Sequence, residues 1–165
     1  MSKAKGLVKA VFIAGILVGI LVAIGTTTNF LLSGGKNPLK LLNFVSSGFF
    51  GEAAFNGGRS MIYLGMMLHF IISVIWAFLL FSFDPVLRVF SKKWLVNGVL
   101  YGVFIWFVMA LIVMPLSNAP SVPLTVKGAF IDVIILVLCA GLPISYLARR
   151  HFLSVETHKA RTTLE

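Results

Sequence analysis

Apolar residues fill four long stretches of the chain, each with few or no charged side chains. These stretches cover residues 7–24, 61–83, 94–116 and 128–148. A helix of about 20 residues crosses the hydrocarbon core of a bilayer, so each stretch has the length of a transmembrane helix. The strict alternation of apolar and polar positions that a membrane β-barrel needs is absent. The pattern predicts an all-α membrane protein with a four-helix transmembrane bundle as one domain over residues 1–150. A polar tail, residues 151–165, follows it.

The first stretch also has features of a secretory signal peptide. Lys3, Lys5 and Lys9 accompany the start of the apolar run, and Ala23 and Gly25 stand at a spacing that resembles a cleavage site. The apolar run is long, however, for the core of a signal peptide, which spans about 7–15 residues. We therefore expect an uncleaved first span, with a cleaved signal peptide as the alternative.

The longest connection between predicted spans covers residues 25–60. Within it, Asn37 followed by Pro38 is typical of a helix start, because Asn caps free backbone N–H groups and Pro suits the first helical position. At helical spacing, the following residues separate into an apolar face and a polar face. The apolar face holds Leu41, Leu42, Val45 and Phe49, and the polar face holds Lys40, Asn43 and Ser47. We expect a short helix in the membrane interface. The alternative is a re-entrant segment, broken near Gly48 and Gly51.

Lys and Arg are distributed unequally between the two sides of the predicted bundle. The side with both termini and the second loop carries ten of them, and the other side carries four. The ten are Lys3, Lys5, Lys9, Arg88, Lys92, Lys93, Arg149, Arg150, Lys159 and Arg161, and the four are Lys36, Lys40, Arg59 and Lys127. Cytoplasmic loops are enriched in Lys and Arg, so we expect both termini in the cytoplasm.

The composition supports a lipid environment. Hydrophobic residues make up 59% of the chain and charged residues 12%, whereas about a quarter of a soluble domain is charged. The net charge of +9 raises nucleic acid as a partner. The basic residues lie in short runs beside apolar stretches, however, and form no basic face interleaved with aromatic residues. We therefore expect membrane lipids, and no nucleic acid, as partners.

Small residues recur every four positions in three of the spans. In lipid, helices associate through close backbone approach and interhelical hydrogen bonds, so such positions predict packing surfaces. The glycines concerned are Gly15, Gly19, Gly65, Gly98 and Gly102; in the second span Gly65 is followed at this interval by His69, Ser73 and Ala77. A second copy of the chain or another membrane protein is a further candidate partner for these surfaces.

Two ionisable residues lie well inside predicted spans, His69 in the second and Asp132 in the fourth. Both spans start on the same side, and a rise of 1.5 Å per residue puts the two residues at depths that differ by roughly 6 Å. One hypothesis is a proton-responsive or ligand-binding pair, because His titrates near neutral pH. The other is a polar clamp between two helices. Pro143 lacks an amide hydrogen and should kink the fourth span.

Motifs for other kinds of chemistry are missing from the sequence. It has no glycine-rich phosphate loop, no HExxH motif and no Cys/His cluster with metal-ligand spacing. Cys139 is the single cysteine, which excludes an internal disulfide. We accordingly expect no catalytic residue, no metal and no cofactor.

The later spans resemble a known family. The run LHFIISVIWAF, the run NGVLYGVFIWFVMALIVMPLS and the closing ARR are similar to small YagU-like bacterial inner-membrane proteins, over residues 65–150. The resemblance implies a bacterial inner membrane and, for some members, an association with acid survival. His69 matches the family pattern, and Asp132 matches it in residue type only.

These observations favour a non-enzymatic accessory or stress-related membrane protein that acts by association with itself, lipid or other membrane proteins. The alternative is a proton-linked transporter or channel built around His69 and Asp132. A membrane enzyme is the third hypothesis.

Overall fold

The computed structural model describes residues 2–90, 93–121, 123 and 125–150 of the 165-residue chain. The predicted polar tail, residues 151–165, lies outside the described residues. Within the described part the regular structure is entirely helical, which confirms the predicted all-α class. The elements in chain order are α1 (Ser2–Leu32), α2 (Leu39–Phe50), α3 (Ala53–Asn56), α4 (Gly58–Phe90), α5 (Trp94–Val108), the π-helical segment η1 (Met109–Val113), α6 (Met114–Leu116), α7 (Val126–Leu136) and the π-helical segment η2 (Val137–Gly141). The last helix continues over residues 142–150.

Four helices are long and apolar enough to cross a membrane, so the chain is a multi-pass membrane protein. The candidate spans are Gly6–Leu32, Gly58–Phe83, Trp94–Leu116 and Val126–Arg150. The first extends eight residues beyond the predicted end at residue 24. The segment after residue 25 remains helical, and within it the Thr26 hydroxyl donates to the Val22 carbonyl at 2.8 Å, so this polar group is satisfied inside the helix.

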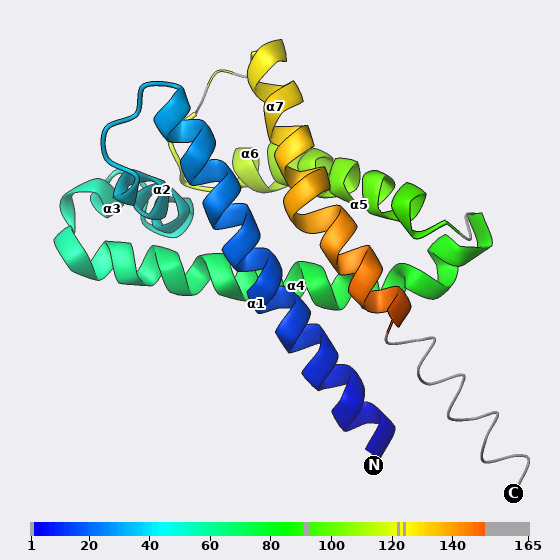
Figure 1. Cartoon of the computed structure of the whole chain (residues 1–165). Coiled ribbons are helices and arrows are strands. Elements are labelled where there is room, and N and C mark those ends of the chain that lie inside the picture. The colour runs from blue at the N-terminus through cyan, green and yellow to red at the C-terminus, as the bar shows by residue number, and fades with distance from the viewer. Residues whose placement is uncertain (1, 91–92, 122, 124, 151–165) are drawn as a thin grey trace, which may run out of the picture.

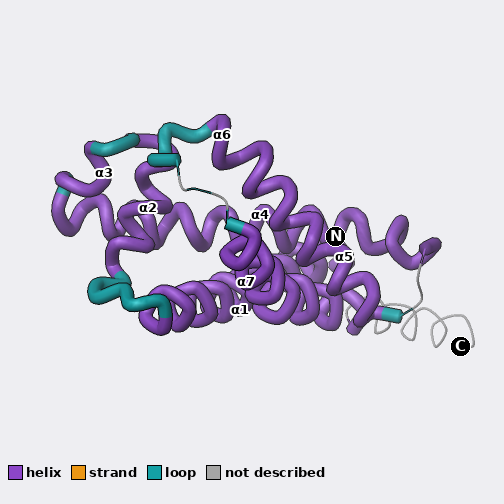
Figure 2. The backbone as a smooth tube through the Cα atoms, turned by 90° about the horizontal axis from the view of Figure 1, so that it is seen from above, coloured by secondary structure: helices purple, strands orange, loops and turns teal. Residues whose placement is uncertain are grey.

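The spans are arranged in two layers. Helices α1 and α7 run antiparallel and side by side, and both cross over the layer formed by α4 and α5 (Figures 1 and 2). Helix α1 packs mainly on α4, while η2 and α7 pack on α5. The core between the layers consists of aliphatic and small side chains, including Ala14, Ala77, Leu80, Ile144 and Ala148.

The two ends of the bundle differ. The beginning of α1, the end of α4, the beginning of α5 and the end of the last helix lie toward the bottom and the right of Figure 1. Helices α2, α3 and α6 lie at the other end. Because the number of spans is even, the beginning of α1 and the end of the last helix lie on the same side of the bundle, as the predicted topology requires.

Two π-helical segments interrupt the third and fourth spans at equivalent places. Segment η1 ends two residues before Pro115, and η2 ends two residues before Pro143. In both, the amide before the proline bonds five residues back: Met114 to the Met109 carbonyl and Leu142 to the Val137 carbonyl. The proline ring would clash with the carbonyl four residues earlier in an α-helix. A π-turn accommodates the proline at this point of the helix, and the kink expected at Pro143 stays a prediction.

Candidate functional site

His69 lies at the crossing of the first two spans. Its Nε2 atom is 2.8 Å from the carbonyl oxygen of Gly19 on α1. A carbonyl oxygen only accepts hydrogen bonds, so Nε2 carries the hydrogen and donates it. The neighbouring Phe70 ring stands edge-on to the imidazole, with centroids 5.6 Å apart. His69 is therefore held by a backbone acceptor of another helix and by an aromatic neighbour.

The glycines of α1 make this approach feasible. A Cβ on Gly15 would lie 2.6 Å from the Val74 Cα, and a Cβ on Gly19 would lie 2.7 Å from the Phe70 ring. Real Cβ atoms do not approach other carbons so closely, so any larger residue would push α1 away from α4. Buried Ser73 adds no free polar group, because its hydroxyl donates to the His69 carbonyl at 2.8 Å.

Asp132 occupies a different part of the bundle. It lies in α7, whose neighbours are α5 and α1, and its side chain is exposed. Within the part of the chain that the structure describes, His69 and Asp132 form no ion pair; the hydrogen bond of His69 goes to Gly19. The structure thus places the two intramembrane ionisable residues in separate surroundings.

The third and fourth spans meet through glycines as well. A Cβ on Gly102 would lie 2.6 Å from the Val137 Cα, and a Cβ on Gly98 would lie 2.9 Å from the Leu142 Cα. Gly141 of η2 faces both glycines of α5, so the two backbones touch without an intervening side chain. Gly65 has another neighbour, since it lies directly against the Leu42 carbonyl of α2.

Two further interhelical hydrogen bonds were not anticipated from the sequence. The Tyr101 hydroxyl donates to the Trp76 carbonyl and links α5 to α4. The Ser145 hydroxyl donates to the Trp94 carbonyl at 2.9 Å and links the last helix to α5. Both side chains are buried. The sequence feature that could have pointed to these bonds is a hydroxyl side chain within an apolar span. Such a hydroxyl needs an acceptor in the protein because hydrocarbon offers none.

The three bonds share one chemistry. His69, Tyr101 and Ser145 each donate one hydrogen bond to a backbone carbonyl of a different helix and so link helices together. Among the described residues, no group of three His, Cys, Asp or Glu side chains is placed to bind a metal ion. Cys139 of η2 is a free thiol, half-buried and close to Gly25 of α1.

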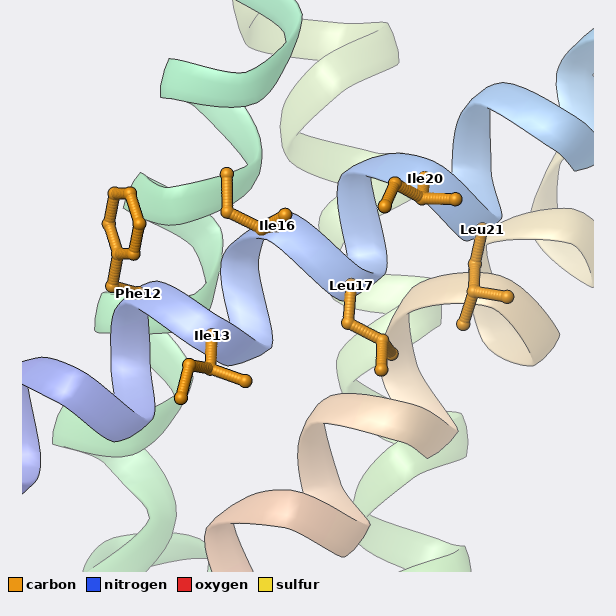
Figure 3. Close-up of a pocket in the computed structure, with 6 residues that line it drawn as sticks. All are labelled: Phe12, Ile13, Ile16, Leu17, Ile20 and Leu21. Carbon is orange, nitrogen blue, oxygen red and sulfur yellow. The ribbon is translucent and has the colours of Figure 1, made fainter.

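A shallow apolar groove runs along the outer surface of α1. Figure 3 shows the side chains that line it, which all come from this helix: Phe12, Ile13, Ile16, Leu17, Ile20 and Leu21. Its lining is aliphatic and aromatic, so it is suited to hydrocarbon and offers no polar group to a soluble substrate.

The chain was also compared with known proteins. No protein-family model matches it, and no curated protein or solved structure does either.

Proposed function

We propose that the chain is a non-enzymatic accessory protein of a bacterial inner membrane that acts by association with lipid or with other membrane proteins. One observation carries the proposal: the His69 imidazole, the residue best suited to proton chemistry, donates to the Gly19 carbonyl as an interhelical clamp. A group used in this way stabilises the bundle.

Lipid association is supported by the surfaces of the bundle. Large apolar side chains are exposed along all four spans, and the groove on α1 is wholly apolar. One end of the bundle contains the beginning of α1 and the end of the last helix. The exposed basic residues at this end are Lys9, Lys93, Arg149 and Arg150. Each basic residue near an anionic headgroup contributes about 1 kcal/mol of attraction. The same charges favour a cytoplasmic location for this end.

The transporter alternative has less support. A proton pathway through His69 and Asp132 would require the two side chains to exchange protons directly or through water. Instead, His69 bonds to α1, and Asp132 is exposed on α7. The stress-related part of the proposal rests on the sequence resemblance to YagU-like proteins. If it holds, a deletion strain should survive acid less well than the parent strain or the complemented deletion strain.

Native mass spectrometry from a mild detergent tests the accessory role, since it reports bound lipids and protein partners together. We expect retained anionic phospholipid, and loss of that lipid when Arg149 and Arg150 are both changed to Gln. Proteoliposomes provide the opposing test. A proton flux that His69→Gln abolishes and the matched surface variant Ser82→Ala leaves intact would overturn the accessory role in favour of transport.

A further inference from the structure

Helix α2 has its polar and apolar residues placed oppositely to those of a helix on a water-exposed surface. Ser46 and Ser47 are completely buried, while Phe49 is 65% exposed and Phe50 is 49% exposed. A helix covering a soluble protein would bury its phenylalanines and expose its serines. Exposed Lys40 lies near the start of α2, where a long side chain can reach the headgroups.

The buried serines need no water. The Ser46 hydroxyl donates to the Asn43 carbonyl at 2.9 Å, and the Ser47 hydroxyl donates to the Phe44 carbonyl at 2.7 Å. Both bonds remain within α2, so the hydroxyls are satisfied without solvent.

The position of α2 along α4 points to the same environment. The Leu42 carbonyl lies against Gly65, seven residues after α4 begins at Gly58. At a rise of 1.5 Å per residue, this contact lies about 10 Å along the span from its start. On this part of α4, Met66 and Met67 are exposed and apolar. Exposed apolar side chains therefore occur both on α2 and on the part of α4 against which it packs.

Asparagine side chains bond to the backbone at both ends of α2, although its N-cap residue is Pro38 and not the expected Asn37. Asn37 accepts from the Leu39 amide at 3.1 Å. Asn118, from the connection between α6 and α7, donates its side-chain amide to the Phe49 carbonyl at 3.1 Å and its backbone amide to the Gly48 carbonyl at 3.0 Å. Free carbonyls at a helix end are costly in hydrocarbon, where only protein groups can satisfy them. Asn118 meets that requirement.

We propose that α2 and α3 form a re-entrant segment inserted into one leaflet of the membrane. This leaflet is the one at the end of the bundle opposite the beginning of α1 and the end of the last helix. Phe49 and Phe50 of α2 and Phe55 of α3 contact lipid acyl chains. The occupant of this surface is lipid because the three phenylalanines are apolar and exposed, and because α2 packs on α4 at a point roughly 10 Å along the span. The assignment does not depend on the accessory role.

Spin labels on single cysteines test the insertion, in the Cys139→Ser background and in liposomes. Labels would be placed at Phe49 and Phe50, with Met67 as the lipid-facing control and Lys36 as the water-facing control. Collision rates with oxygen, which partitions into hydrocarbon, and with a water-soluble nickel complex are then measured by electron paramagnetic resonance. We expect the oxygen-to-nickel ratio at Phe49 and Phe50 to equal that at Met67 and to exceed that at Lys36 several-fold.

Two results would overturn the proposal. A ratio at Phe49 and Phe50 equal to that at Lys36 would mean that α2 is a water-exposed cap. Immobile labels that neither reagent reaches would mean that protein, such as a second copy, covers the surface. If a label on α2 impairs folding, as shown by thermal unfolding, Phe55 on α3 provides the deciding measurement with the same expected ratio.

Discussion

His69 on α4 donates its Nε2 hydrogen to the carbonyl oxygen of Gly19 on α1, across 2.8 Å. The two residues are fifty positions apart in sequence and meet where α1 and α4 come closest. Gly19 contributes twice: its carbonyl accepts the bond, and its missing side chain leaves room for Phe70. The hydrogen bond and the close packing therefore occur at the same point of the helix crossing.

Removing the clamp should cost stability. We expect His69→Leu to lower the free energy of unfolding by about 0.6 kcal/mol and by at most about 1.7 kcal/mol, the range for polar pairs in membrane bundles. Thermal unfolding in mild detergent measures the loss. His69→Gln is the matched control, since its amide can still donate to the Gly19 carbonyl. Equal stability of wild type and His69→Leu would show that the bond contributes nothing.

The glycine contacts predict a position-dependent effect of one added methyl group. Gly102→Ala places a Cβ 2.6 Å from the Val137 Cα, so the helices must separate, and we expect a loss of about 1–3 kcal/mol. Gly6→Ala is the control, because nothing lies within 4 Å of its Cβ. In a helix, that substitution should be neutral or stabilising by about 0.5–1 kcal/mol. Equal unfolding temperatures for the two variants would contradict the contact at Gly102.

The fold was predictable because length and hydropathy suffice to define transmembrane helices. A span must be apolar and at least about 20 residues long, and the sequence shows both properties directly. The ends were less predictable: α1 continues to Leu32, through three threonines, which have low helix propensity. Hydropathy does not record that the Thr26 hydroxyl finds its acceptor within the helix.

The candidate site was less predictable, since side-chain partners depend on helix rotation and crossing. The depths of His69 and Asp132 along their spans suggested a meeting, but depth along an axis says nothing about direction around it. His69 contacts α1, and Asp132 is exposed. The π-turns had a sequence signal in Pro115 and Pro143, although a proline is also compatible with a simple kink or a helix end.

The placement of His69 and Asp132 predicts independent contributions to stability. We expect the effect of the double variant His69→Gln, Asp132→Asn on unfolding free energy to equal the sum of the single effects, within about 0.5 kcal/mol. Thermal unfolding of all four proteins provides the cycle. A larger coupling would mean that the two side chains interact in the membrane, and the proton-linked hypothesis would gain support.

The orientation proposal predicts which loops face the outside of the cell. In the Cys139→Ser background, Lys36→Cys should react with a membrane-impermeant maleimide in intact cells, because this exposed residue lies at the end of the bundle that holds α2. Lys93→Cys, at the opposite end, should react only after the cells are opened. Reaction of Lys93→Cys in intact cells would reverse the orientation.

The packing of α1 on the last span can be tested by one engineered disulfide. A Cβ on Gly25 would lie 3.0 Å from the Cys139 Sγ, so a sulfur on that Cβ comes within reach of a bond of about 2.0 Å. We expect Gly25→Cys to form an intramolecular disulfide on mild oxidation, blocking both thiols from a mass-tagged maleimide until a reductant is added. Ile24→Cys is the matched control: the neighbouring side chain is exposed, so its thiol should stay free under the same conditions. Free thiols in Gly25→Cys, or crosslinked dimers in its place, would show that α1 and η2 do not pack in this register. An intramolecular disulfide that forms in Gly25→Cys but not in Ile24→Cys requires α1 to pack on η2. It also requires α1 to be rotated about its axis so that residue 25, and not residue 24, faces Cys139.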